Sequence, residues 1–328
     1  MTYSVVSEKL ENLFSYYSTT QNILRWPSVF VLPGWMKSWW QSFGAGYTAR
    51  PLLVCRDDDV IGIAPLKIKD GVASFIGDNS VCDYLDFITT PDMEGIFAST
   101  LLDYLKTQGV KRLLLETLRP DSIATVNVAH ESQQRGWKVD FSSVDTSSEM
   151  QLPSDWNAYL SMLEARYRRD AERKMRQLEN VAPVRFEVLR DFEVEEVDLT
   201  TFFHMMAGSR RDKASFLTDD MKDYFRRLTS AMASYGLLRL AFMYVGVACV
   251  AGILYFDYQD RIYLYNSGYT QQYAGMNVGL VSKLCAIRQA VSGGKKAFDF
   301  LKGPEIYKSR LGGHEVKLSC CDIIINPD

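Results

Sequence analysis

The sequence predicts an α/β (α+β) protein made of two tandem units, each a mixed, twisted sheet flanked by helices. Three observations support this fold class. The chain has 328 residues, whereas a single core stops growing at roughly 250. Its composition, 47% apolar and 23% charged, is typical of a folded globular protein. The same order of elements, three strands, a helix and a further strand, is predicted once in each half of the chain.

The second half shows this order most clearly. Apolar segments separated by tight turns predict three antiparallel strands, at 237–245, 247–256 and 261–269. In the next segment, 274–294, apolar side chains recur at helical spacing and two glycines end the pattern. The apolar face of this helix consists of Leu280, Leu284, Ile287 and Val291. A strand is then predicted at 295–301.

The first half repeats the order with similar spacing. Strands are predicted at 50–56, 60–68 and 72–78, a helix at about 92–108 and a closing strand at 111–118. Gly109 corresponds to Gly294 and Leu114 to Phe298, at offsets of 185 and 184 residues. Because few residues are identical between the halves, the repeat rests on element order and spacing. We therefore expect an N-terminal unit at 1–150 and a C-terminal unit at 151–328.

A strongly basic helix is predicted at the start of the second unit, over 155–180, with Asp155 as its N-cap. Its basic residues are Arg166, Arg168, Arg169, Arg173, Lys174 and Arg176. Three interpretations stay open: a solvated amphipathic face, a wall that binds an anionic ligand through Arg168 and Arg169, or a surface that binds nucleic acid.

Charge and composition narrow the functional classes. The net charge of −3 provides no overall attraction for nucleic acid, so such binding would need a local basic patch. The N-terminus lacks the features of a signal peptide, which predicts a cytoplasmic protein with six reduced cysteines. The longest uncharged stretch, 240–256, is shorter than the ~20 residues of a membrane helix and is divided by Gly246, so a buried hairpin is predicted instead. His130 and His204 have no acidic or cysteine partner at useful spacing, and no metal site is expected. His314, after two glycines near the end of the chain, stays open as a minor candidate base.

Three stretches of the second half carry a resemblance to a known family. They are Trp156 with Tyr159 and Leu160, then Asn277 to Leu280 at a helix start, and Phe298-Asp299-Phe300 followed by Gly303 and Tyr307-Lys308. These stretches resemble the acetyltransferases associated with cellulose and exopolysaccharide loci (CelD-like). That family has the GNAT fold of acyl-CoA-dependent N-acyltransferases and is related to the Fem aminoacyltransferases. The first half resembles it loosely, at Ala64-Pro65-Leu66 and at Asp83 to Asp86.

The resemblance implies acyl transfer from acetyl-CoA or another acyl-CoA to an amine, on an amino sugar or a cell-envelope or exopolysaccharide precursor. The pyrophosphate of coenzyme A would lie at the helix start, where unpaired N–H groups and glycines receive phosphate. The residues implied are Gln272, Gly275, Asn277, Val278 and Gly279. Two departures bear on this site. Similar proteins have Ser-Pro-Gly where this chain has Asn277-Val278-Gly279, and Asn277 also replaces the last Gly or Ala of the general acyl-CoA signature.

The stretch after the last predicted strand supplies candidate catalytic groups. Strand alternation puts Phe298 and Phe300 on one face and Asp299 on the other, where Asp299 could orient the acceptor amine or take its proton. The position of Tyr307 resembles that of the general-acid tyrosine in this fold. A structural ion pair of Asp299 with Lys308 and a structural tyrosine remain the alternatives. Candidate substrate-binding residues are Lys302, Glu305, Lys308, Arg168, Arg169, Asp83 and Asp86, with Arg310 as a further cation.

Two other functions stay open beside the acyltransferase. A Fem-like transferase would take its aminoacyl group from charged tRNA, and a binding protein with the same fold would have no turnover. The acceptor, the acyl length and the oligomeric state are not predicted from the sequence.

Overall fold

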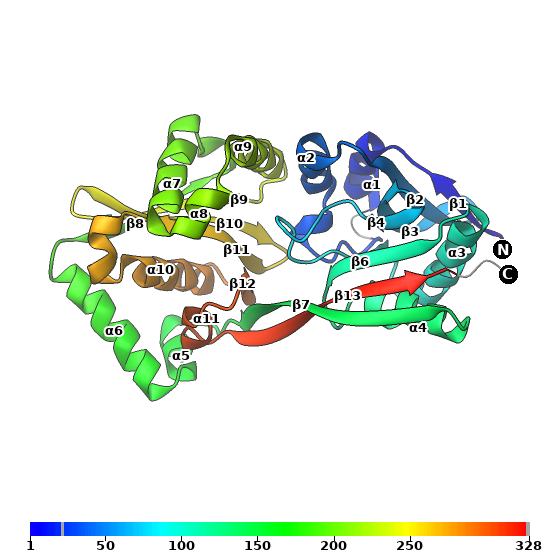
Figure 1. The fold of residues 1–328 in the computed structure, drawn as a ribbon. Helices are drawn as coiled ribbons and strands as arrows, with labels where there is room; N and C mark the ends of the chain where they lie inside the picture. Colours follow the sequence, from blue (N-terminus) through cyan, green and yellow to red (C-terminus); the bar gives the residue numbers. More distant parts are fainter. Residues whose placement is uncertain (21–22, 326–328) are drawn as a thin grey trace. The chain divides into compact units, whose positions relative to one another are not determined.

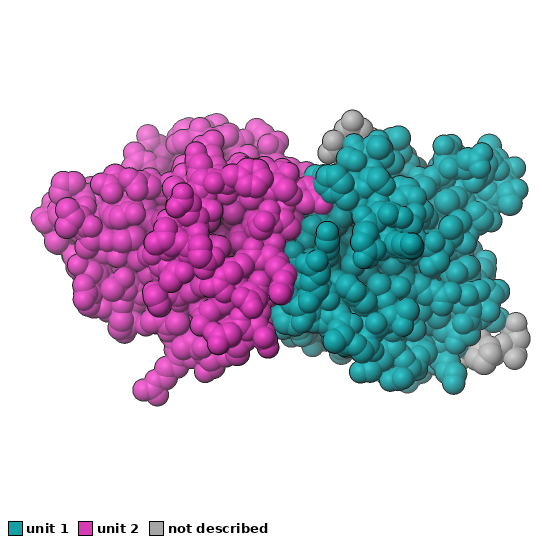
Figure 2. Space-filling view, turned by 90° about the horizontal axis from the view of Figure 1, so that it is seen from above, with its two compact units in different colours: residues 1–146, 316–328 teal, residues 147–315 magenta. Residues whose placement is uncertain are grey.

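The computed structural model describes residues 1–20 and 23–325. They form two compact units: unit 1 contains the described residues of 1–146 and 316–325, and unit 2 contains residues 147–315 (Figure 2). The predicted boundary at residue 150 lies close to the boundary of the units. The predicted C-terminal limit differs, because the last segment packs in unit 1. Among the described residues, no helix is long and apolar enough to cross a membrane.

Unit 1 contains an antiparallel run of strands that ends in a parallel pair. Its strands are β1 (Tyr3–Ser7), β2 (Thr48–Arg56), β3 (Asp59–Lys69), β4 (Val72–Phe75), β5 (Ile88–Thr89) and β6 (Arg112–Leu118). Its helices are α1 (Leu13–Thr20), α2 (Pro33–Phe43), α3 (Glu94–Thr107) and α4 (Ala129–Gln134). Neighbouring strands from β1 to β4 pair antiparallel, and β4 pairs parallel with β6. The apolar residues of α3 pack against this sheet. The helix and the strands form where the sequence predicts them.

Unit 2 has the same core order. Its strands are β8 (Val184–Arg190), β9 (Leu238–Val245), β10 (Ala248–Tyr258), β11 (Arg261–Tyr269) and β12 (Ala297–Lys302). Its helices are α5 (Trp156–Met162), α6 (Ala165–Glu179), α7 (Glu196–Ser209), α8 (Arg211–Phe216), α9 (Asp219–Ser234), α10 (Val278–Ser292) and α11 (Tyr307–Arg310). Strands β8 to β11 pair antiparallel in sequence, and β11 pairs parallel with β12 across the connection through α10. The predicted structural repeat is therefore confirmed.

Two long strands remain. Each pairs with a strand of one unit, although the elements just before it in the sequence belong to the other unit. The end of β7 (Lys138–Gln151), which follows the elements of unit 1, pairs antiparallel with β12 of unit 2. Strand β13 (His314–Ile324), which follows the elements of unit 2, pairs antiparallel with β6 of unit 1. An Arg112–Asp322 ion pair of 2.6 Å accompanies this pairing. Each unit thus completes its sheet with a strand from the other half of the sequence.

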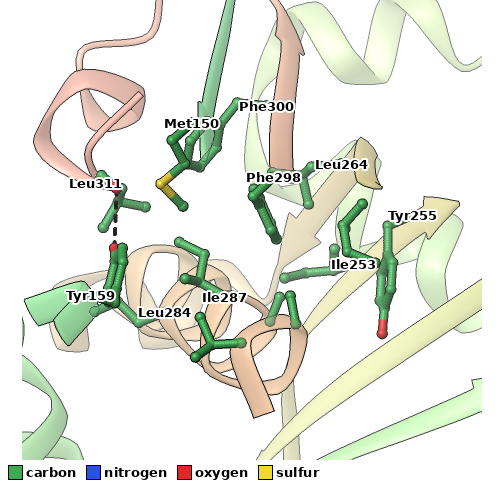
Figure 3. Close-up of a cluster of buried hydrophobic side chains, with 14 of the residues drawn as sticks. Met150, Tyr159, Ile253, Tyr255, Leu264, Leu284, Ile287, Phe298, Phe300 and Leu311 are labelled. Carbon is green, nitrogen blue, oxygen red and sulfur yellow. Dashed lines mark hydrogen bonds between the residues drawn. The ribbon is translucent and has the colours of Figure 1, made fainter. Parts of the chain in front are cut away.

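Helices cover both faces of the sheet in unit 2 (Figure 1). α7, α8 and α9 lie on one face, and α10 lies on the other. The buried cluster beneath α10 combines Leu284 and Ile287 with Phe298 and Phe300 of β12 (Figure 3). The hydroxyl of Tyr159 donates a hydrogen bond of 3.1 Å to the carbonyl of Leu311 at its edge. Strand alternation therefore directs both phenylalanines into the core, as the sequence predicts.

The basic helix predicted over 155–180 is interrupted. Asp155 caps α5 as predicted, because its carboxylate accepts a 2.9 Å hydrogen bond from the N–H of Ala158. At Leu163 and Glu164 the backbone is extended, and α6 then begins. The interruption lets Leu163 enter the same buried cluster as Tyr159. Burial of this side chain outweighs the regular helical pattern that predicted one continuous helix.

Candidate functional site

A cavity forms in unit 2 where β11 and β12 stop pairing. The two strands pair only from Arg261↔Ala297 to Tyr263↔Asp299, although β11 continues to Tyr269 and β12 to Lys302. A cavity of about 250 Å³ is lined by the end of β11, the start of α10, the segment after β12, and the α7–α8 junction. The strand–helix–strand connection therefore directs the N-terminus of its helix, the end of β11 and the segment after β12 toward one space.

The start of α10 supplies backbone to this cavity. Asn277 and Gly279 line it, whereas Gln272 and Gly275 are exposed and do not. Asn277 occupies the N-cap position, but its side chain makes no capping hydrogen bond. It has a left-handed backbone (φ 59°), a conformation that Asn tolerates better than most residues. Asn277 therefore acts at the helix start through its backbone conformation, and its backbone carbonyl accepts from the N–H groups of Leu280 and Val281.

The two glycines of the predicted phosphate site differ sterically. A Cβ atom on Gly279 would lie 3.0 Å from the ring of Tyr269, which also lines the cavity. A Cβ atom on Gly275 would meet nothing within 4 Å. Of the two glycines, only Gly279 is therefore needed for the ring of Tyr269 to pack closely against the helix start.

Glu305 and Lys308, both predicted from the sequence, lie together after β12. The carboxylate of Glu305 lies 3.1 Å from the ammonium of Lys308 and 3.2 Å from the guanidinium of Arg210. Although burial acts in the opposite direction, these cations hold the pKa of Glu305 below its usual value. The buried Lys308 also donates to the carbonyls of Leu301 (2.8 Å) and Gly303 (3.1 Å), so it holds the turn after β12. Glu305 lines the cavity, and Lys302 is half-buried nearby in sequence but does not line it.

Tyr307 lines the cavity as the resemblance implies. Its ring makes an edge contact with Phe300, with 6.3 Å between centroids. Burial raises the pKa of Tyr307, so the hydroxyl keeps its proton at neutral pH. A protonated hydroxyl at this position is able to donate a proton or a hydrogen bond to a ligand.

Asp299 lies elsewhere. Its side chain is fully buried and does not line the cavity. The carboxylate accepts a 2.9 Å hydrogen bond from the N–H of Leu301 and lies 3.4 Å from Arg261, which also binds Glu149 at 2.6 Å. The expectation that Asp299 faces a polar cleft therefore needs correction: alternation does turn it away from the phenylalanines, but toward a buried ion pair. The predicted pairing with Lys308 is replaced by this pair with Arg261, and a catalytic role for Asp299 stays a prediction.

Arg168 and Arg169 lie on α6 and do not line the cavity. Arg169 is exposed and donates to the carbonyl of Ala165 on its own helix. Their proposed roles in binding an anionic acceptor or tRNA stay predictions.

Asp83 and Asp86 are both buried in unit 1. Asp86 accepts hydrogen bonds from the N–H groups of Phe87 (2.9 Å), Ile123 (2.9 Å) and Ala124 (3.0 Å). The last two belong to the start of a helix, where such N–H groups have no partner within the helix. Asp86 thus anchors a helix start, and the predicted role of both residues in acceptor binding stays a prediction.

Burial raises the pKa of Asp86 to about 7, although its three N–H donors favour the charged form. An unfolded aspartate has a pKa of about 3.9. The folded state therefore binds the proton more tightly, and this contribution to stability is complete below pH 4 and lost as the pH rises through 7. We expect the stability advantage of wild type over Asp86→Asn to shrink by roughly 3 kcal/mol from pH 4.5 to 8. Urea unfolding of both proteins measures this, and a pH-independent difference would contradict it.

Sequence reasoning missed two buried or half-buried lysines that line the cavity, Lys213 and Lys283. A signal for Lys283 was present, because it lies between Leu280 and Leu284 on the apolar face of its helix. Lys213 lies on the short helix α8 and carries no comparable signal. The described residues contain no group of histidine, cysteine and acidic side chains that could hold a metal ion.

Comparison with known proteins supports a specific fold. Residues 165–309 match the family model described as an acetyltransferase (GNAT) domain. No curated protein sequence matches the chain. Among solved structures, the chain is similar to FemX, with 14% identity, coverage of 98% of this chain and 97% of that chain, and a TM-score of 0.66.

Two further structures cover the whole chain or nearly so. A tandem GNAT protein from the clavulanic acid biosynthesis pathway is 10% identical, with 100% of each chain covered and a TM-score of 0.51. A conserved protein of unknown function from Bacteroides thetaiotaomicron is 8% identical, with coverage of 98% and 100% and a TM-score of 0.57. Identities this low show a shared fold. Residues 165–309 therefore match the model of a GNAT acetyltransferase domain, and the two-unit fold of the chain is similar to that of a tandem GNAT protein.

Proposed function

We propose that unit 2 transfers an acyl group from an acyl-CoA to an amine. The observation that carries this proposal is the cavity between the diverging ends of β11 and β12, with the N-terminus of α10 at its wall. The first N–H groups of a helix have no partner within the helix and attract phosphate. Gly279 lines the cavity at this helix start and carries no side chain that would cover the backbone there. The donor would then extend from α10 into the space toward Tyr307.

The proposed reaction needs few groups. The neutral amine attacks the thioester carbonyl, an amide carbon–nitrogen bond forms as the carbon–sulfur bond breaks, and the proton that the nitrogen loses passes through water and replaces the one given to the thiolate. We assign Tyr307 to donate a hydrogen bond, and then the proton, to the departing thiolate, since the residue lines the cavity and its hydroxyl is protonated. Glu305 and Arg210 would fix the polar end of the acceptor. The resemblance of the last stretch favours an amino sugar or an exopolysaccharide or cell-envelope precursor as this acceptor.

Calorimetric titration with coenzyme A and acetyl-CoA tests the proposal. We expect micromolar binding to wild type, and binding at least about tenfold weaker, ~1.4 kcal/mol, for Gly279→Val. The new side chain would enter the space of Tyr269 and of the ligand. Gly275→Val is the matched control, because its side chain points into open space and should leave binding unchanged.

Each other outcome has a defined meaning. A folded wild type that binds neither ligand would sink the proposal. Equal weakening by both glycine variants would move the ligand away from α10. Binding of coenzyme A without acetyl transfer to any amine in a screen would favour a binding protein without turnover.

A second candidate is aminoacyl transfer from charged tRNA, and α6 is the observation that favours it. Its basic side chains are largely exposed, and Arg173 and Lys174 share one carboxylate, Asp170. If tRNA binds here, affinity should fall steeply with salt and fall further in Arg168→Ala/Arg169→Ala. Salt-independent or absent tRNA binding would remove this candidate.

A further inference from the structure

Two ammonium groups enter the cavity without a counterion. Lys283, on α10, is 7% exposed, and its ammonium donates a 2.9 Å hydrogen bond to the carbonyl of Gly279. Lys213, on α8, donates to the amide oxygen of Asn266 at 2.9 Å and to the carbonyl of Ser267 at 2.5 Å. All three acceptors are neutral. In the part of the chain that the structure describes, neither ammonium has a carboxylate within ion-pair distance.

The acidic residue of the cavity compensates them only in part, because it favours both charged amines from a distance without pairing with either. Glu305 is already shared between Arg210 and Lys308. Lys308 makes its remaining hydrogen bonds to the carbonyls of the turn after β12. The lining of the cavity therefore has an excess of positive charge, from Lys213 and Lys283, in a place shielded from water.

This charge excess has an electrostatic cost. Burial, and then the nearby cation Lys213, lower the pKa of Lys283 to about 7. Burial, followed by the charge of Arg210, lowers the pKa of Lys213 to about 8. A negative group between the two lysines would reverse both effects, because an opposite charge favours the protonated amine. The lining of the cavity is thus electrostatically suited to an anion.

The number and placement of the two ammonium groups indicate which kind of anion they would bind. Two ammonium groups on different helices belong to residues that line the cavity, and the two oxygens of a carboxylate match two such point donors in number. The cavity of about 250 Å³ leaves room for a small acid beside the reacting groups. The face of Tyr307 lies 4.8 Å from the ammonium of Lys283, so this anion would lie next to the proposed proton donor.

We propose that Lys213 and Lys283 bind a carboxylate carried by one of the two reacting molecules, so that the enzyme uses an acidic acyl group or an acidic amine acceptor. This inference rests on the proposed function, which it deepens by naming the charge of the substrate. It separates two sources of the same chemistry: a carboxylate on the acyl chain of the donor, or one on the acceptor.

Calorimetry with defined probes tests both sources. In the donor arm, acetyl-CoA is compared with succinyl-CoA. In the acceptor arm, succinate is titrated into protein saturated with coenzyme A. We expect at least tenfold tighter binding of succinyl-CoA than of acetyl-CoA if the donor carries the acid, or Lys283-dependent binding of succinate if the acceptor does. Lys283→Met and Lys213→Met should each remove the preference, since methionine keeps the chain length without the charge.

A matched control and a second readout exclude a merely structural effect. Lys295, beyond the other end of α10, pairs with Asp257 at 2.6 Å and lies outside the cavity, so Lys295→Met should retain the preference. The carboxylate should raise the lysine pKa values, so binding at pH 7.5 should take up protons. Titrations in two buffers of different ionisation enthalpy measure this uptake, which Lys283→Met should reduce.

The failures are distinguishable. Equal affinity for the two acyl-CoAs, together with no binding of succinate, would overturn the carboxylate site while leaving the proposed function intact. Equal binding of succinate by wild type and both lysine variants would also overturn it. If no form of coenzyme A binds, the proposed function fails, and succinate titrated into the free protein still decides whether Lys213 and Lys283 form a carboxylate site.

Discussion

Replacing Gly268 with alanine should destabilise unit 2 by more than about 3 kcal/mol. Gly268 lies in β11 directly beneath α7. An added Cβ atom would lie 2.3 Å from the backbone nitrogen of Met206 and 2.4 Å from the carbonyl carbon of Met205. Both are backbone atoms, so no side-chain rotation relieves the clash and α7 would have to move away from the sheet. Urea unfolding followed by circular dichroism measures the loss.

Gly208→Ala is a matched control, because Gly208 belongs to α7 itself and a Cβ atom there meets nothing within 4 Å. We expect it to be neutral or to stabilise the protein by up to ~1 kcal/mol, since alanine favours helix more than glycine does. Similar stability of the two variants would show that α7 shifts easily over β11. The wall of the cavity formed by the α7–α8 junction would then be adaptable rather than rigid.

Arg261→Met should cost about 3 kcal/mol or more, because it removes the cation from a buried pair with Asp299. Asp299 is fully buried, and Arg261 also binds Glu149 on β7. Breaking a buried pair from one side leaves negative charge in a poorly solvated place. Adding Asp299→Asn to Arg261→Met should therefore recover part of the loss in a urea-unfolding measurement.

The same variants decide between the two roles of Asp299. A structural role predicts that Asp299→Asn lowers the free energy of unfolding and changes the rate of acyl transfer little at temperatures where the variant is folded. A catalytic role predicts the reverse, loss of turnover at unchanged stability. If Arg261→Met and Asp299→Asn both leave stability unchanged, the ion pair contributes nothing and the contacts of Asp299 would need another explanation.

Local sequence patterns were sufficient for much of the fold. The alternating apolar runs predicted β9 to β11, and the helical spacing of Leu284, Ile287 and Val291 predicted α10, because side-chain periodicity follows directly from backbone geometry. The repeat was detectable for the same reason. The interruption of the basic helix at Leu163 was not predictable. A continuous helical pattern does not show which distant residues form the buried cluster that Leu163 joins.

The candidate site was predicted in part. Gly279, Asn277, Glu305 and Tyr307 do line one cavity, as their place after β11 and β12 suggested. Asp299 was expected beside them, but alternation only says that a side chain leaves one face of a strand. What covers the other face depends on residues such as Arg261 and Glu149, which are distant in sequence.

By itself, the sequence determined the elements, their order, the two-unit repeat and the helix start that the proposed donor needs, since these depend on neighbouring residues. Only the tertiary structure decided that the end of β7 completes the sheet of unit 2 and that β13 completes the sheet of unit 1. It also decided that Gly268 has no room for a side chain and that Lys213 and Lys283 line one cavity. These properties depend on steric and electrostatic contact between distant segments. Charge excess and close packing arise only when the chain brings such segments together.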